Sequence, residues 1–404
     1  MCAIMSATTM ISADDRALDE LIAHIRGATT DTADAALEVP VSHYISPERA
    51  ARERELLLRL PLVVAHVSEV AEPGRFVTRE YMGVPILIVG QRDGGVKVFR
   101  NMCRHRGGMV ELAPSGKRGL FMCQYHGWSY AAAEGGALKV VPYEETAGGV
   151  DKGCRSLIEL PSQVRHGLVW AMLSEGEMPP VEEFLGPEVD AQIGPWKLGE
   201  STILMDHAMD KQINWKIVVD GTLDSLHAQF LHGKPGGVGS LSVNHAMVFR
   251  DYGRHGKMIM GRRRLKRKID AGETPEPDLR TMASVMLLYP NSLFVEAPDH
   301  VELWSVWPDA QDPARSTVCI RFLVRSEILT PEIEERVHRS WEILRDAAVE
   351  EDFPMEESIQ RNAHASPRAS FTYGRNEKSA QHLHRQLFRD IDEGVAGPGT
   401  LAMV

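Results

Sequence analysis

The chain has 404 residues, 43% of them hydrophobic and 25% charged, which is typical of a globular protein with two or three domains. Its net charge of −11 argues against nucleic acid as a general partner, because phosphate binding requires a basic face. No stretch approaches the roughly 20 consecutive apolar residues of a membrane span, and residues 1–10 lack the features of a signal peptide. Together with only five cysteines, these features predict a soluble, cytoplasmic protein that does not interact with membranes and uses its cysteines as thiolates.

The sequence pattern of the first half of the chain changes once, from helical periodicity to short β-rich runs. Residues 14–26 and 47–60 carry apolar residues three or four positions apart, so residues 1–57 are expected to form an N-terminal helical arm. Residues 58–176 consist of short β-rich runs broken by Gly and Pro, which predicts a small antiparallel β domain. Its strands are expected at residues 62–67, 84–90, 96–100, 120–130 and 166–173.

The second half, residues 177–404, begins after a Pro- and acid-rich connection and has a mixed pattern. Helical periodicity marks residues 213–231 and 331–351. Strands are expected at residues 282–289, 292–296, 301–307 and 317–324. The sequence therefore predicts an α+β domain, followed by a loose tail from Glu393.

Two short motifs in the β domain each combine a thiol with an imidazole. Cys103 and His105 are followed, after seventeen intervening residues, by Cys123 and His126. Two thiolates on one iron and two histidines on the other are the ligands of a Rieske [2Fe–2S] cluster. A structural zinc site also uses two Cys and two His, but zinc motifs usually place like ligands in pairs, so we favour the cluster.

The motifs CRHRG and CQYHGWSY resemble the Rieske signature of ring-hydroxylating oxygenase α subunits, the family of Rieske non-haem iron oxygenases. Gln124 stands where many members have Pro, and no functional consequence is expected. The resemblance implies a small antiparallel β Rieske domain and a larger catalytic domain with a helix-grip (START-like) antiparallel sheet.

A second motif, in the other half of the chain, contains Asp224, His227 and His232. Residues three apart share a helix face, so Asp224 can hold a ring N–H of His227. The two histidines are five apart, about 140° around an ideal helix, so both can face one metal only if the helix ends or bulges between them. An isolated pair of this spacing would be two solvated helix residues, but beside a Rieske motif it indicates a mononuclear Fe(II) site.

Two histidines need one carboxylate to complete the facial triad of a non-haem Fe(II) oxygenase. By resemblance to the acidic motif near the C-terminus of the family, the carboxylate is expected to be Asp352, with Glu351 as the nearest rival. The family often has Asn after the acidic residue that precedes the histidine motif, whereas here Asp220 is followed by Gly221.

The resemblance implies a terminal oxygenase component that takes electrons from NAD(P)H through a ferredoxin or reductase and hydroxylates a hydrophobic, aromatic substrate with O2. Ring dihydroxylation is favoured, and monooxygenation with O- or N-dealkylation remains open. A homotrimer, with or without a β subunit, would bring one cluster beside the next subunit's iron, with Asp224 bridging His126 to His227. The alternative from another class is an electron carrier fused to a ligand-binding domain, which would have no use for the triad.

Three further features carry weaker expectations. The basic run of residues 262–268 is expected to be a solvated strand or loop face, although it could dock an acidic ferredoxin. His364, His382 and His384 are expected at the surface. Pocket residues are expected among a pool of apolar side chains: Leu223, Phe230, Leu231, Leu287, Phe294 and Trp304.

Overall fold

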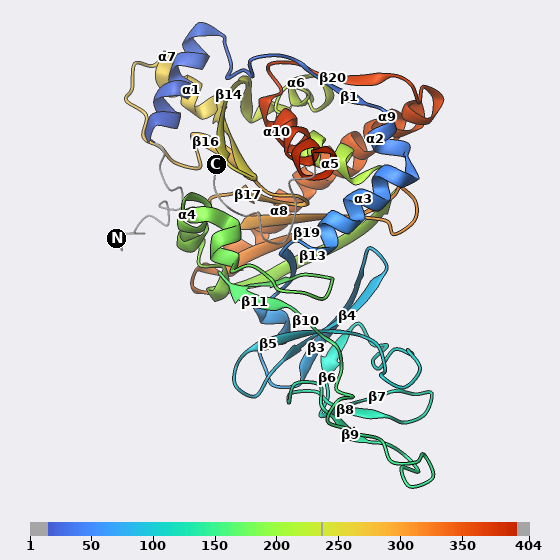
Figure 1. The fold of residues 1–404 in the computed structure, drawn as a ribbon. Helices are drawn as coiled ribbons and strands as arrows, with labels where there is room; N and C mark the ends of the chain where they lie inside the picture. Colours follow the sequence, from blue (N-terminus) through green and yellow to red (C-terminus); the bar gives the residue numbers. More distant parts are fainter. Residues whose placement is uncertain (1–14, 236, 394–404) are drawn as a thin grey trace, which may run out of the picture. The chain divides into compact units, whose positions relative to one another are not determined.

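The computed structural model describes residues 15–235 and 237–393, so the expectations for residues 1–14 and for the tail from 394 onward lie outside the described residues. The chain divides into two compact units (Figure 1). Residues 54–184 form the small unit, and residues 15–53 together with 185–235 and 237–393 form the large unit. The two divisions fall inside helices α3 (Pro47–Leu58) and α4 (Val181–Ile193).

The small unit is built from antiparallel strands in three sheets, in the orders β10-β5-β4-β3-β6, β11-β12-β2 and β7-β8-β9. Its strands are β2 (Leu62–His66), β3 (Arg75–Tyr81), β4 (Val84–Gly90), β5 (Val96–Arg100), β6 (Ser115–Lys117), β7 (Leu120–Met122), β8 (Ser129–Ala131), β9 (Leu138–Val140), β10 (Glu159–Leu160), β11 (Ser162–Arg165) and β12 (Leu168–Ala171).

The core of the small unit holds the cysteine motifs in place. Phe76 and Phe121 pack edge to face, with ring centroids 5.4 Å apart. Cys103 and Cys123 belong to the same buried cluster. The stretch of residues 120–130, expected to be one strand, is a hairpin, because Gly127 at φ +71° turns the chain between β7 and β8.

The large unit is organised on a seven-stranded antiparallel sheet in the order β13-β19-β18-β17-β16-β15-β14. Its strands are β13 (Ser201–Lys211), β14 (Ser242–Tyr252), β15 (His255–Arg262), β16 (Met282–Leu288), β17 (Ser292–Glu296), β18 (Val301–Pro308) and β19 (Ser316–Arg325). A separate two-stranded sheet pairs β1 (Leu37–Pro40) with β20 (Ser370–Tyr373). This mixture of helices and antiparallel sheets confirms the α+β fold class.

Helices cover this sheet, and Figure 1 shows α5, α9 and α10 grouped together beside it. The N-terminal helix α1 packs through Leu18 and Leu21 against Val248 and Ile259 of β14 and β15, so this helix is part of the large unit's core. The remaining helices are α1 (Asp15–Gly27), α2 (Ser42–Ile45), α5 (Trp215–Thr222), α6 (Ala228–Leu231), α7 (Arg263–Asp270), α8 (Pro331–Ala347), α9 (Phe353–Ala365) and α10 (Lys378–Leu387). No described helix is both long and apolar enough to cross a bilayer.

Two expectations about the large unit were wrong. Residues 263–268 of the basic run lie in helix α7, not in a strand or loop, because Leu265 is buried and Ile269, one turn later, packs against the same cluster. His382 and His384 on α10 are buried, with 5% and 1% of their surface exposed, and not at the surface. His384 lies there because its Nε2 is 2.9 Å from the carboxylate of Asp220.

Candidate metal centres

The two cysteine motifs of the small unit form two similar loops. In the first, the backbone N–H of Cys103 donates to Gly108 O, and that of Gly107 donates back to Cys103 O at 3.0 Å. In the second, the backbone N–H of Cys123 donates to Trp128 O, and that of Gly127 donates to Cys123 O. Gly107 and Gly127 have φ values of +81° and +71°, a conformation that side chains disfavour, which accounts for glycine in both loops.

These loops bury the thiols and expose the imidazoles. Cys103 and Cys123 are each 3% exposed, whereas His105 and His126 are exposed, with ring centroids 4.6 Å apart. The ring of His105 also stacks on Trp128 at 4.9 Å. Two buried thiols and two exposed imidazoles form a donor set that fits a Rieske cluster and would hold it through Cys103, Cys123, His105 and His126.

Burial raises the pKa of the Cys103 thiol, whereas the surroundings of His105 favour its metal-binding form. Tyr130 OH lies 3.2 Å from Cys103 Sγ and accepts from the backbone N–H of Arg104, so its O–H can donate to the sulfur. The pKa of His105 is lowered by desolvation and by the nearby charges of His126 and Arg106. A neutral imidazole, the form that binds a metal, is therefore the stable one at neutral pH.

The second site is built where helices of the large unit end. The side chain of Asn214 accepts from the N–H of Lys216 and caps α5, which ends at Thr222. Asp224 Oδ1 then accepts from the N–H of Leu226 at 2.7 Å, so the expected helix of residues 213–231 is broken at this turn. His227 and His232 flank the single turn of α6, which brings their rings to a centroid distance of 5.1 Å.

The carboxylate of this site comes from a π-helical turn, η6 (Ala348–Asp352), between α8 and α9. Such wide turns often occur at functional sites, and this one points two successive side chains toward the histidines. Asp352 Oδ1 lies 2.9 Å from His232 Nε2 and 3.5 Å from His227 Nε2, and the two Nε2 atoms are 3.2 Å apart. His227, His232 and Asp352 thus present three ligand atoms to one point.

The spacing of these three atoms fits a divalent metal. Ligands that meet at about 90° around an ion with bonds of about 2.1 Å lie about 3.0 Å apart, and those of a tetrahedral site about 3.4 Å apart. The observed separations of 2.9, 3.2 and 3.5 Å span these values. Two imidazoles and one carboxylate are the donor set of the facial triad, which leaves other positions open.

Each histidine has a second carboxylate behind it. His227 Nδ1 lies 3.3 Å from Asp224 Oδ2, and His232 Nδ1 lies 2.7 Å from Glu351 Oε2. Lys234 forms an ion pair with the same Glu351. Glu351, the rival for the ligand position, therefore lies on the far side of the His232 ring, and both rings are oriented with Nε2 toward the shared point.

The carboxylates and histidines of this site shift one another's pKa values strongly. Burial alone would lower the pKa of His227, but the carboxylates of Asp224 and Asp352 raise it to about 10. The pKa of His232 is likewise lowered by burial and raised overall by Asp352 and Glu351. Burial would raise the pKa of Asp352, whereas the two histidines lower it, so this carboxyl stays ionised. Metal binding at this site would therefore displace protons from the histidines.

Two cavities of the large unit meet at these residues. The larger one, of about 640 Å³, extends from His227, His232 and Asp352 along the sheet to α8. Apolar side chains of β15, β16, β17, β18 and α8 line much of it: Met258, Met260, Ala283, Val285, Val295, Trp304, Ile343 and Leu344. Of the expected pool of pocket residues, Trp304 lines this cavity and Leu231 lines the smaller one.

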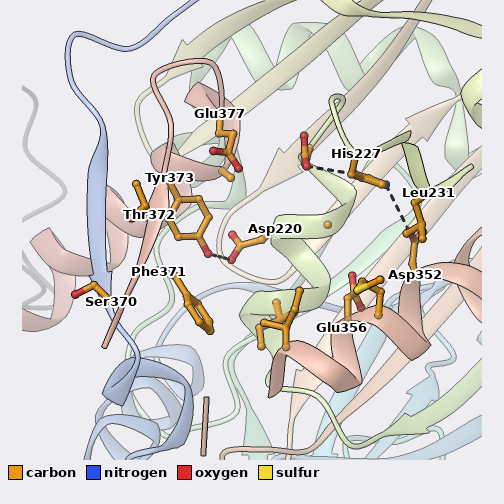
Figure 2. Close-up of a pocket in the computed structure, with 16 residues that line it drawn as sticks. Asp220, His227, Leu231, Asp352, Glu356, Ser370, Phe371, Thr372, Tyr373 and Glu377 are labelled. Atoms are coloured by element: carbon orange, nitrogen blue, oxygen red, sulfur yellow. Dashed lines mark hydrogen bonds and ion pairs between the residues drawn. The ribbon is translucent and has the colours of Figure 1, made fainter. Parts of the chain in front are cut away.

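Figure 2 shows the smaller cavity, of about 440 Å³, which opens on His227 and Asp352 from between α5, α9 and β20. Tyr373 OH donates to Asp220 at 2.5 Å there, and Glu356 and Glu377 add further carboxyl groups. Burial and the charge of Asp352 raise the pKa of Glu356 well above its usual value. A Cβ at residue 221 would lie 2.3 Å from Glu356 Oε1, so Gly221 leaves room for that side chain.

Comparison with known proteins points to the same two parts of the chain. The family described as "Rieske [2Fe-2S] domain" matches residues 61–158, and that described as "Ring hydroxylating alpha subunit (catalytic domain)" matches residues 200–393. Together the two families match most of the chain.

Individual relatives differ in the reactions that their names describe. The chain is 34% identical over 152 residues to the chlorobenzene dioxygenase subunit alpha of Cupriavidus sp. (strain PS12), covering 37% of this chain and 30% of that protein. It is 27% identical over 221 residues to the glycine betaine monooxygenase oxygenase subunit of Chromohalobacter salexigens, covering 54% and 48%. The matched segments therefore span half or less of these curated relatives.

Among solved structures, the fold is similar to that of the quaternary ammonium Rieske monooxygenase CntA, with a TM-score of 0.73 and 21% identity. The match covers 91% of this chain and 98% of that one. At this identity the likeness concerns the fold.

Proposed function

This chain belongs to the Rieske non-haem iron oxygenases, as a ring-hydroxylating α subunit, and we propose on that premise that it is a terminal oxygenase acting on a hydrophobic, aromatic substrate. Its cofactors are a Rieske [2Fe–2S] cluster and a mononuclear iron. The observation that carries the proposal is the convergence of His227, His232 and Asp352 at the end of a largely apolar cavity.

We propose that Cys103, His105, Cys123 and His126 hold the cluster, and that His227, His232 and Asp352 hold the mononuclear iron. When bound, the cluster supplies single electrons and the iron supplies open positions for O2. Asp224 and Glu351 keep the two imidazoles in one orientation through hydrogen bonds at Nδ1.

The larger cavity would hold the substrate beside these ligands. Its apolar walls exclude water from the reacting carbon, and shape decides which bond of the substrate faces the iron ligands. An electron carrier with an inert ligand-binding domain would not need the three converging ligands, which is why we prefer the enzyme.

We further propose that electrons come from NAD(P)H through a ferredoxin or reductase and cross between subunits of a homotrimer. His126 is exposed on the small unit, and Asp224 lines the smaller cavity beside His227. Asp224 could therefore form a hydrogen-bonded link between His126 of one subunit and His227 of the next. An Asp224→Asn variant should keep its metals but lose most of its coupled turnover. Full coupled turnover in that variant would refute the link.

The favoured reaction is dihydroxylation, in which an arene, O2, two electrons and two protons give a cis-dihydrodiol. In the alternative, one oxygen atom is inserted into a C–H bond of the substrate, and the other is reduced to water with the same two electrons and two protons. If the hydroxylated carbon is bonded to O or N, the product then loses that carbon by dealkylation. The monooxygenase named among the relatives keeps this alternative open.

Labelling with 18O2 tests the proposed reaction. Turnover of a panel of aromatic compounds, with a surrogate reductase and ferredoxin, should give a product with two labelled oxygen atoms. A single labelled atom would favour the monooxygenase, and no O2-dependent product from any compound would contradict the proposed substrate class.

A further inference from the structure

Among the described residues that line the larger cavity, Arg262 is a charged side chain without an ion-pair partner. Arg262 is the last residue of β15 and directly precedes α7. Its backbone N–H donates to Thr281 O at 2.8 Å, and its side-chain Nε donates to Met282 O at 3.0 Å. Within residues 15–235 and 237–393, no carboxylate lies within ion-pair distance of its guanidinium, although the side chain is partly buried and lines the cavity.

The acidic residues of the cavity near the sheet are already engaged by other groups. Glu296 forms an ion pair with Lys257 at 2.7 Å. Asp299 lies 2.7 Å from His300 Nδ1, and Glu302 lies 3.6 Å from His300 Nε2. The two carboxylates hold His300 as a cation, since they raise its pKa to about 9 against the effect of burial.

The other two arginines of the cavity differ from Arg262 in both exposure and pairing. Arg336 is 53% exposed and 3.6 Å from Asp299, and Arg339 is 59% exposed and 3.5 Å from Glu335. These two arginines are exposed and paired with carboxylates, whereas Arg262 is less exposed and has no carboxylate within ion-pair distance.

Partial burial of a charge that has no ion-pair partner costs free energy, so such a group often has a function. Burial lowers the pKa of Arg262 while Asp278 and Glu302 raise it, and an arginine stays charged at neutral pH. The free nitrogens of a guanidinium form a planar fork that matches a carboxylate.

The larger cavity offers a cationic substrate few aromatic faces. Cations such as quaternary ammonium groups are bound over the faces of several aromatic rings. Among the described lining residues, Trp304 is the one aromatic side chain other than the imidazoles, and its indole N–H is bonded to Glu302 at 3.0 Å.

We propose that Arg262 binds a carboxylate of the substrate, so that the substrate is an aromatic carboxylic acid whose apolar body fills the cavity between Arg262 and the iron ligands. This inference rests on the proposed function, because it assigns a substrate class to the same cavity. Arg262 is then a specificity residue, which binds the part of the substrate that does not react.

Binding to the holoenzyme tests the inference without turnover. Anaerobic calorimetry would compare benzoate and 1-naphthoate with their neutral amides, and choline would serve as the cationic probe. In the wild-type protein the carboxylates should bind about tenfold to a hundredfold more tightly than the amides, as a charge-assisted hydrogen-bonded pair implies.

Variants then assign this preference to one side chain. Arg262→Met should bind acid and amide equally, and Arg262→Lys, which keeps the charge but not the fork, should retain part of the preference. Arg264→Met, which removes an exposed arginine of α7, is the matched control and should behave as wild type.

The inference is overturned if no carboxylate binds to the wild type, if the amides or choline bind as tightly as the acids, or if Arg262→Met keeps the preference. Metal content separates this failure from that of the proposed function. A wild-type protein without mononuclear iron would contradict the oxygenase itself, whereas a fully loaded protein with no preference for acids contradicts only the role of Arg262.

Discussion

The two neighbouring carboxylates of the π-helical turn provide a sharp test of the iron site. Asp352 faces the Nε2 atoms of both histidines, whereas Glu351 faces Nδ1 of His232 and forms an ion pair with Lys234. We expect Asp352→Asn to remove a metal ligand, and Glu351→Gln to remove only the partner that orients His232.

The expected losses of iron affinity differ because the two charges differ. Two unit charges about 4 Å apart interact with about 4 kcal/mol near a protein surface, and the carboxylate of Asp352 would lie closer than that to a divalent ion. Asp352→Asn should therefore weaken Fe(II) binding on the order of a thousandfold or more. Lys234 already neutralises Glu351, so Glu351→Gln should cost about tenfold to a hundredfold, as is usual for partners behind a metal ligand.

The assay is anaerobic titration with Fe(II) against a competing chelator, on protein that retains its cluster. The Rieske EPR signal of each variant reports that the rest of the chain is folded. Glu350→Gln, on the same turn but exposed, is the control and should bind iron normally. A greater loss in Glu351→Gln than in Asp352→Asn would refute the assignment and make Glu351 the ligand.

Two further predictions follow from pKa shifts and hydrogen bonds. Because Asp299 and Glu302 raise the pKa of His300 from 6.5 to about 9, its protonation stabilises the folded state fully below about pH 6.5 and the effect is lost as the pH rises through 9. The unfolding free energy from urea titrations should fall by about 3 kcal/mol across this range and stay flatter in His300→Gln; equal slopes would contradict this. Tyr130→Phe removes the hydroxyl that lies 3.2 Å from Cys103 Sγ. Loss of this hydrogen bond should lower the reduction potential of the cluster by some tens of millivolts. An unchanged potential would show that the hydroxyl does not donate to the sulfur.

Local sequence patterns were sufficient for the features in which neighbouring residues act together. The two cysteine and histidine motifs indicated a cluster from short-range spacing alone, and they lie on two similar loops in which Gly107 and Gly127 have positive φ. The five-residue spacing of His227 and His232 required an irregular helix, and α6 is a single turn between them.

Features that depend on distant contacts could not be read from the sequence. Strand β13 (Ser201–Lys211) is partly exposed along most of its length, so it lacks the alternating pattern that marks a strand. A π turn changes the direction of successive side chains, so spacing could not separate Glu351 from Asp352. Arg262 belongs to a basic run in the sequence, and only the fold directs it to the cavity while its neighbours on α7 are exposed.

The central claim is that two independent iron sites occur in one chain. Its most direct test is the iron and acid-labile sulfide content of anaerobically purified protein, with EPR after reduction, for wild type and His227→Ala. We predict three irons and two sulfides in the wild type, and two irons with an unchanged Rieske signal in the variant. Two irons in both proteins would mean an electron carrier, and would contradict the oxygenase.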